Sequence, residues 1–110
     1  MHFRADIANC ENDRDKVLSV CQCGDDGEIE YEVIIQRGPK EFDVFDDVPG
    51  PRITCNELGL DLVPGPERIL FSDNLLIIVL SDSTNIEVDI SSLTEEEIQD
   101  LRTVAKAIFE

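Results

Sequence analysis

The sequence predicts an α+β fold: a mostly antiparallel β-sheet of six or seven strands with one C-terminal helix packed on a face. Apolar and polar residues alternate in several short runs, which is the pattern of strands with one exposed face. Short stretches of turn-forming residues separate these runs, and their lengths are typical of β-hairpin loops. The last segment has the apolar spacing of a helix. A chain of 110 residues suits one domain, spanning 1–110.

The first half of the chain contains three predicted strands. Residues 3–7 alternate between apolar and polar side chains, and residues 16–23 and 31–37 are rich in β-branched and other apolar residues. Between the second and third strands lies Asp26-Gly27, a pair that tolerates positive φ at both positions of a type I′ turn. We therefore expect a β-hairpin there.

The second half contains the remaining predicted strands. A short strand is expected at 52–58, and "ERILFSDNLLIIVL" (67–80) predicts a second hairpin that turns at Asp73-Asn74. Its latter half is apolar on both faces, so we expect a central strand that is covered on both sides. Residues 86–90 alternate again and form the last predicted strand.

The closing segment "SSLTEEEIQDLRTVAKAIFE" predicts the helix. Thr94 and Glu97 have the spacing of a capping box, and Leu93 and Ile98 occupy the positions of a hydrophobic staple. We expect the helix to begin there and to turn an apolar stripe toward the sheet. The residues of that stripe are Ile98, Leu101, Val104, Ala105 and Ile108.

Two cysteines on one strand, Cys21 and Cys23, raise the question of a metal site. They could supply half of a zinc tetrahedron, but the sequence has a single histidine, His2, and no C-x-x-C pair. The aspartates and glutamates of 25–30 do not follow the calcium-loop spacing. We interpret the cysteines as small strand hydrophobes with free thiols, and expect no metal or cofactor.

The charge balance narrows the classes of function. The chain has 25 acidic residues against nine Lys and Arg, a formal net charge of −16. Such an excess disfavours direct binding to nucleic acid or an anionic membrane and favours a basic protein partner. There is no P-loop, dinucleotide fingerprint or G-x-S-x-G motif, so we expect no enzymatic activity. Since no apolar leader of about 7 to 15 residues follows Met1, we expect a cytoplasmic protein.

Several motifs in order resemble a known family. They are "FRADI", a strand ending "EVIIQRG", "PGPRI", "ERILFSDNLLIIVL" and the terminal "VDISSLTEEEIQDLRTVAKAIFE". Together they resemble the small immunity proteins that form family ten of bacterial polymorphic toxin systems, over nearly the whole chain. The Cys21/Cys23 pair and the second Gly-Pro, at Gly65-Pro66, depart from that pattern.

The resemblance implies a cytoplasmic immunity protein that binds a cognate toxin and blocks it sterically. A basic, nuclease-like toxin would suit the acid excess, because complementary charge speeds association. We predict that the loop-rich segment 38–67 presents the contacts, with two phenylalanines as candidate apolar anchors among acids. The alternative is that these phenylalanines pack under their own loop. The predicted partner-binding residues are Phe42, Asp43, Phe45, Asp46, Asp47, Glu57 and Asp61. The alternative is an acidic, non-catalytic interaction module or accessory domain with no toxin partner.

Overall fold

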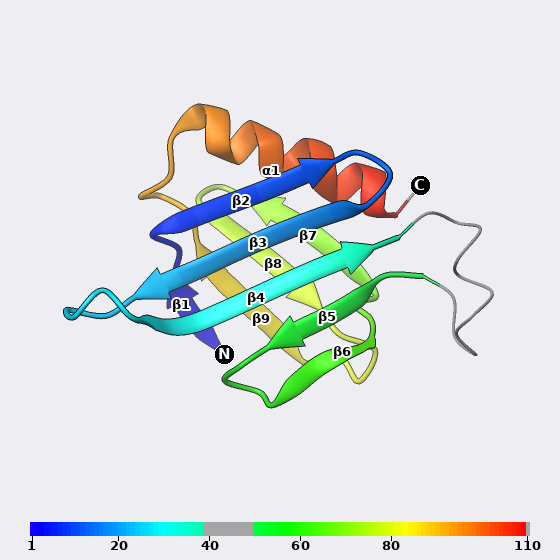
Figure 1. Ribbon diagram of the computed structural model, residues 1–110, viewed down its shortest axis with the longest axis horizontal. Coiled ribbons are helices and arrows are strands. Elements are labelled where there is room, and N and C mark those ends of the chain that lie inside the picture. Colours follow the sequence, from blue (N-terminus) through cyan, green and yellow to red (C-terminus); the bar gives the residue numbers. More distant parts are fainter. Residues whose placement is uncertain (39–49, 110) are drawn as a thin grey trace.

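The computed structural model describes residues 1–38 and 50–109. Within these ranges the chain forms nine strands and one C-terminal helix (Figure 1). The α+β class is confirmed, but the strands are nine rather than six or seven. They also form two mostly antiparallel sheets instead of one.

The two sheets differ in size and in the part of the chain that builds them. The smaller sheet has the order β1-β9-β8-β7, and the larger sheet has the order β2-β3-β4-β5-β6. The strands of the smaller sheet are β1 (His2–Arg4), β9 (Asn85–Asp89), β8 (Leu75–Val79) and β7 (Arg68–Ser72). Those of the larger sheet are β2 (Ile7–Asn12), β3 (Lys16–Cys23), β4 (Ile29–Arg37), β5 (Arg52–Cys55) and β6 (Leu60–Pro64).

The predicted first strand, residues 3–7, is wrong as a single element. The chain crosses between the sheets at Ala5 and Asp6: β1 pairs in parallel with β9, and β2 then pairs with β3. The crossing changes which side chains face the core. Phe3 and Ala5 are buried as expected, whereas Ile7 lies on the outer face of the larger sheet and is 44% exposed.

Both predicted hairpins are confirmed. β3 and β4 pair antiparallel, and so do β7 and β8 on either side of Asp73-Asn74, where Asp73 has a φ of 51°. The predicted type I′ turn at Asp26-Gly27 is wrong, since Gly27 alone of that pair has a positive φ. The loop is longer than a two-residue turn. The Gly27 amide donates to the Gly24 carbonyl oxygen, and the Gly24 amide donates to the Glu28 carbonyl oxygen.

The segment after β5 contains a strand that the sequence did not predict. β6 pairs antiparallel with β5, and the register shifts between Ile53 and Cys55. The predicted strand 52–58 is accordingly shorter, because residues after Cys55 form the turn into β6. The connection from β6 to β7 carries the chain back to the smaller sheet and includes a cis peptide bond at Gly65-Pro66.

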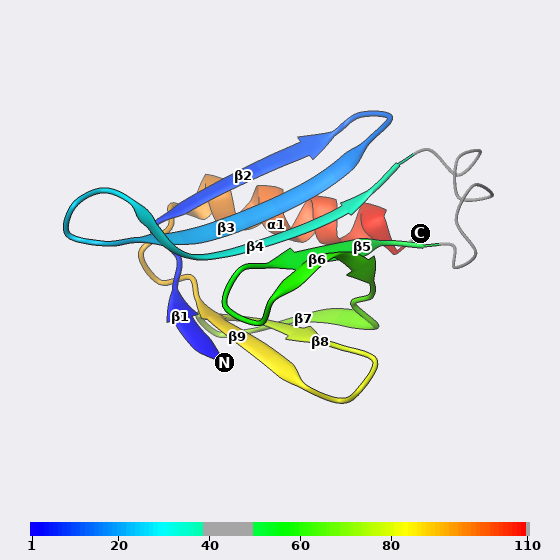
Figure 2. The same cartoon turned by 60° about the horizontal axis from the view of Figure 1, so that its bottom comes forward.

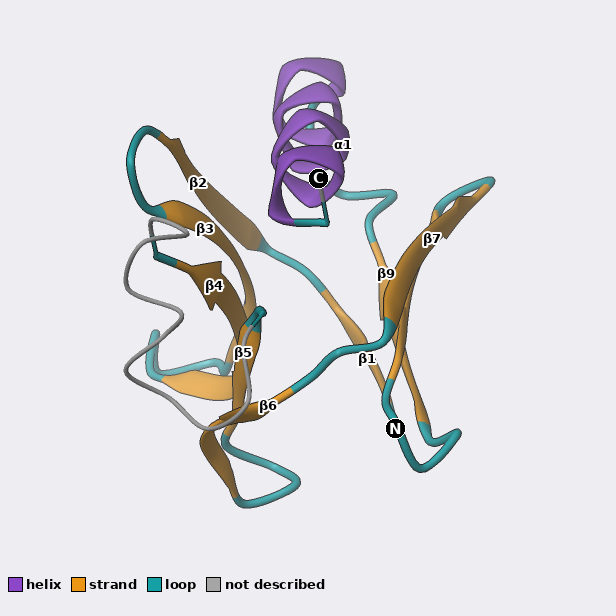
Figure 3. Ribbon diagram, turned by 90° about the vertical axis from the view of Figure 1, so that its right-hand side faces the viewer, coloured by secondary structure: helices purple, strands orange, loops and turns teal. Residues whose placement is uncertain are grey.

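The helix α1 (Glu95–Ile108) begins where the capping box predicts. The Glu97 amide donates to Thr94 Oγ1 at 3.1 Å, and the Thr94 amide donates to Glu97 Oε1 at 3.0 Å. The helix packs mainly against β2 and β3. It lies over the open side between the two sheets, as Figure 3 shows end-on. Ile98 of the predicted stripe is partly buried, and the other four residues are buried. These four are Leu101, Val104, Ala105 and Ile108.

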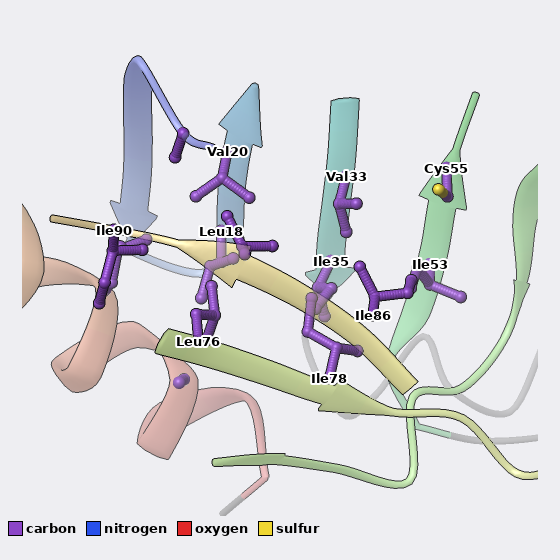
Figure 4. Close-up of a cluster of buried hydrophobic side chains, with 14 of the residues drawn as sticks. Leu18, Val20, Val33, Ile35, Ile53, Cys55, Leu76, Ile78, Ile86 and Ile90 are labelled. Carbon is purple, nitrogen blue, oxygen red and sulfur yellow. The ribbon is translucent and has the colours of Figure 1, made fainter. Parts of the chain in front are cut away.

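The two sheets face each other (Figure 2), and the hydrophobic core lies between them (Figure 4). Leu18, Val33 and Ile35 of the larger sheet face Leu76 and Ile78 of the smaller one (Figure 4), and all five are fully buried. Buried residues alternate along β4 and β8, and Leu18 and Val20 do the same in β3, where Cys21 is buried as well. This alternation places the apolar set on one face of each sheet. The two sheets therefore share one core.

The expectation that β8 is covered on both faces holds for one face only. Leu76 and Ile78 are buried, while Leu75, Ile77 and Val79 on the outer face are partly exposed. β8 is central in its sheet, between β9 and β7. No helix in the described part of the chain is long and apolar enough to cross a membrane.

Candidate functional site

Only two of the predicted partner-binding residues lie within the described structure. Glu57 is exposed in the turn after β5, and Asp61 is exposed in β6. Five others lie outside the described residues: Phe42, Asp43, Phe45, Asp46 and Asp47. The predicted grouping of Glu57 and Asp61 with those five is therefore still a prediction.

The described structure instead brings a second group of acids to Glu57 and Asp61. The hairpin of β3 and β4 and the hairpin of β5 and β6 lie toward the same end of the larger sheet (Figure 1). We call their carboxylates the acidic end. They belong to Asp25, Asp26, Glu28, Glu30, Glu32, Glu57 and Asp61. Residues 24–32 and 56–61, which carry all seven, include no Lys, Arg or His.

Asn56 joins the two halves of the acidic end. Its side-chain amide donates to the Glu30 carbonyl oxygen at 3.0 Å, and its Oδ1 accepts from the Glu32 amide at 2.8 Å. The Asn56 amide also donates to the Glu32 carbonyl oxygen at 3.4 Å. These bonds continue the pairing of β4 and β5 beyond Cys55, so Glu57 is held beside the start of β4.

Local geometry also orders the tip of the first hairpin. Asp26 Oδ1 accepts a hydrogen bond from the Glu28 amide at 3.0 Å, which is the bond of an Asx turn. Glu30 folds back along Gly24, where an added Cβ would come within 2.6 Å of Glu30 Oε1. Glycine at position 24 thus leaves room for the Glu30 carboxylate. This part of the acidic end has a defined backbone.

The arrangement suits a broad electrostatic surface rather than a chelating pocket. Six of the seven acids are exposed and Glu32 is partly buried, and they spread over two hairpins. Across the described ranges, no three His, Cys, Asp or Glu side chains are placed to hold a metal ion. Like charges spread in this way attract a complementary cationic surface over a Debye length of about 8 to 10 Å in physiological salt.

The cysteines of the larger sheet differ in burial and in their surroundings. Cys21 is buried, and Cys23 is partly buried beyond a register shift at Gln22/Cys23. Burial, with the neighbouring Cys23, raises the pKa of Cys21. Cys10 faces the helix from β2, and burial, helped by the charge of Asp100, raises its pKa to about 11. Burial therefore favours the protonated form of Cys10 and of Cys21.

Sequence reasoning missed the acidic end because it explained each half separately. Asp25, Asp26, Glu28 and Glu30 suited a hairpin turn and an exposed strand face, and that local explanation is also correct. The bonds from Asn56 to Glu30 and Glu32 span 24 to 26 residues and have no signal in the sequence. Charge alone gave a signal, since both segments are acidic and lack bases.

No family model matches this chain, and no curated protein matches it.

Proposed function

We propose that this protein is an immunity protein, which binds a cognate toxin of a bacterial polymorphic toxin system and blocks it sterically in the cytoplasm. Two lines of support are independent of one another. The first is the resemblance of the ordered motifs from "FRADI" to the terminal helix. The second is the acidic end, whose seven carboxylates lie on two joined hairpins within residues 24–32 and 56–61, segments that contain no base.

The acidic end is the observation that carries the proposal. A cationic toxin surface, such as the one with which a nuclease holds its substrate, would be drawn to this end and then covered by it. Complementary charge of this kind raises association rates by roughly ten- to a thousand-fold at low salt. No covalent step is involved, because inhibition needs only that the toxin surface stays occupied.

Affinity capture with charge-reversed variants tests this proposal. The wild-type chain, a Glu57→Lys/Asp61→Lys variant and a matched Glu96→Lys/Asp100→Lys variant serve as baits in extracts of the source bacterium. Both variants change the net charge equally, but the substitutions of the Glu96→Lys/Asp100→Lys variant lie at exposed positions of α1. We expect wild type and the helix variant to retain one basic protein that the acidic-end variant loses.

The salt dependence of capture gives a second readout. Retention of the toxin by the wild-type chain should weaken steeply as salt rises, and the acidic-end variant should lose part of that slope. Equal retention by all three baits would show that the acidic end is not the contact surface. Retention of acidic proteins or of no protein would favour an accessory module over an immunity protein.

A further inference from the structure

A groove beside the helix α1, on the side away from β2, is lined mainly by cations, in contrast to the acidic end. It lies between β7 and the C-terminal half of α1 and has a volume of about 640 Å³. Its apolar lining comes from Ile69, Phe71, Ala105 and Phe109, of which Phe109 is 38% exposed. The groove exists because α1 packs mainly against β2 and β3, which leaves the side toward β7 less filled. Figure 3 shows the helix between β2 and β7.

One wall of the groove is the edge of a sheet. β7 is the outermost strand of the smaller sheet and pairs with β8 on its inner side. In residues 1–38 and 50–109, no strand pairs with its outer side. The outward amide and carbonyl groups of an edge strand can accept a further strand from another chain. β7 offers five residues, Arg68–Ser72, for such pairing.

The charges around the groove are mainly positive. Among the described residues, Arg68, Arg102 and Lys106 line it, which is three of the nine Lys and Arg in the sequence, against one acid, Glu67. The Arg102 guanidinium lies over the Phe71 ring at 4.7 Å from its centroid. This cation-π contact places a charge directly over the apolar floor. In a chain with a net charge of −16, this local excess of cations favours a ligand that carries carboxylates.

We propose that this groove binds an extended, acidic segment of another protein, which adds to β7 as an antiparallel or parallel strand. Alternate side chains of the segment would be apolar and pack on Phe71 and Phe109. Its carboxylates would lie on the other face of the segment and pair with Arg68, which alternates with Ile69 and Phe71 along β7. This inference goes beyond the proposed function and is independent of it, because the groove would repel the basic toxin that the acidic end attracts.

Peptide binding to the full chain tests the inference. The probe is a capped peptide of about seven residues that alternates valine and glutamate, long enough to cover a strand of the length of β7. A second peptide has lysine in place of glutamate, and a third has N-methylated backbone amides along one edge. Fluorescence anisotropy gives the affinity, and amide chemical shifts locate the peptide on the protein. We expect the glutamate peptide alone to bind and to shift the amides of β7.

Charge reversal identifies the groove as the site. Arg68→Glu should weaken binding of the glutamate peptide by about ten-fold. Arg14→Glu is the control, because the turn between β2 and β3 lies across α1 from β7 (Figure 3). Circular dichroism verifies that each variant is folded. No binding by wild type, equal loss in Arg14→Glu, or equal binding of the lysine or N-methylated peptide would overturn the inference.

Discussion

Arg37, the last residue of β4, donates a hydrogen bond from Nη1 to the carbonyl oxygen of Ile108, the last residue of α1, at 3.0 Å. The bond joins the larger sheet to the helix across 71 positions of sequence. The carbonyl groups in the last turn of a helix have no partner within the helix and carry partial negative charge. A partly buried guanidinium therefore satisfies one of them and anchors the end of α1.

Replacing Arg37 by methionine keeps most of the side-chain volume and removes the donors. We expect the free energy of unfolding to fall by about 1 to 2 kcal/mol, since a charge-assisted bond to a helix end is lost. Urea unfolding followed by circular dichroism measures this. A midpoint and slope equal to those of wild type would mean that the bond has no net effect on stability.

The capping box gives a second prediction. Thr94→Ala removes the acceptor of the Glu97 amide and should cost about 1 kcal/mol of unfolding free energy. Thr103→Ala is the matched control on the same helix, because alanine favours the helix interior and Thr103 Oγ1 donates only to the Gln99 carbonyl. Thermal unfolding of both variants compares them. A loss in Thr103→Ala as large as that in Thr94→Ala would contradict the role of the cap.

The environment of Asp6 predicts that the stability of the fold depends on pH in the acidic range. Its carboxylate accepts hydrogen bonds from the Cys23 amide and from Arg4 Nε, each at 3.0 Å, where the chain crosses between the sheets. The bond from Cys23, with that from Arg4, lowers the pKa of Asp6 from its ordinary value of 3.8. Because the pKa is lowered, ionised Asp6 stabilises the folded state at pH values above the ordinary pKa of 3.8. This stabilisation disappears as pH falls through the lower pKa of the folded state.

Asp6→Asn should therefore lower the melting temperature at pH 7 and show a smaller further loss than wild type between pH 4 and pH 2. The measurement is a series of thermal unfolding curves across that range. Parallel curves for the two proteins, offset by a constant amount, would show that ionisation of Asp6 does not contribute.

Cys10 predicts a dependence at the opposite end of the pH scale. Its pKa is raised from 9.0 to about 11 by burial and by Asp100. A raised pKa means that the stability contribution is complete below the unfolded value and is lost as pH rises from about 9 to 11. Alkylation with iodoacetamide, followed at Cys10 by mass spectrometry, should be slow at pH 8 and accelerate in that window. Native and urea-unfolded protein reacting equally fast at pH 8 would contradict this.

Short-range features of the fold were predictable from the sequence, because each depends on neighbouring residues. Thr94 and Glu97 mark the start of α1, and Asp73-Asn74 marks the turn between β7 and β8. The split into two sheets was not predictable. Phe3, Ala5 and Ile7 keep one alternating pattern across the crossing at Asp6, although the strands on its two sides join different sheets.

β6 escaped prediction for a different physical reason. It follows Gly59, contains Leu62 with a φ of 52° and ends at Pro64, all of which resemble a loop. It forms because β5 offers an edge with which to pair, and Thr54 Oγ1 accepts a bond from the Leu62 amide at 3.2 Å. Tertiary pairing therefore overrides local propensity in this strand.

The candidate site was predictable in kind but not in place. The acid excess indicated an electrostatic surface, and Glu57 and Asp61 are exposed as a surface residue must be. The contribution of Glu30 and Glu32 depends on Asn56, which meets them only after β4 and β5 have paired. The groove beside β7 depends on where α1 packs, which the helix sequence does not specify.

The most direct measurement is growth of a host cell that expresses the basic protein captured by the wild-type chain, with and without this chain. The account predicts that the captured protein alone arrests growth and that co-expression of the wild-type chain restores it. It also predicts that the Glu57→Lys/Asp61→Lys variant restores growth less well than Glu96→Lys/Asp100→Lys. A captured protein that does not arrest growth, or an arrest that the wild-type chain does not relieve, would contradict it.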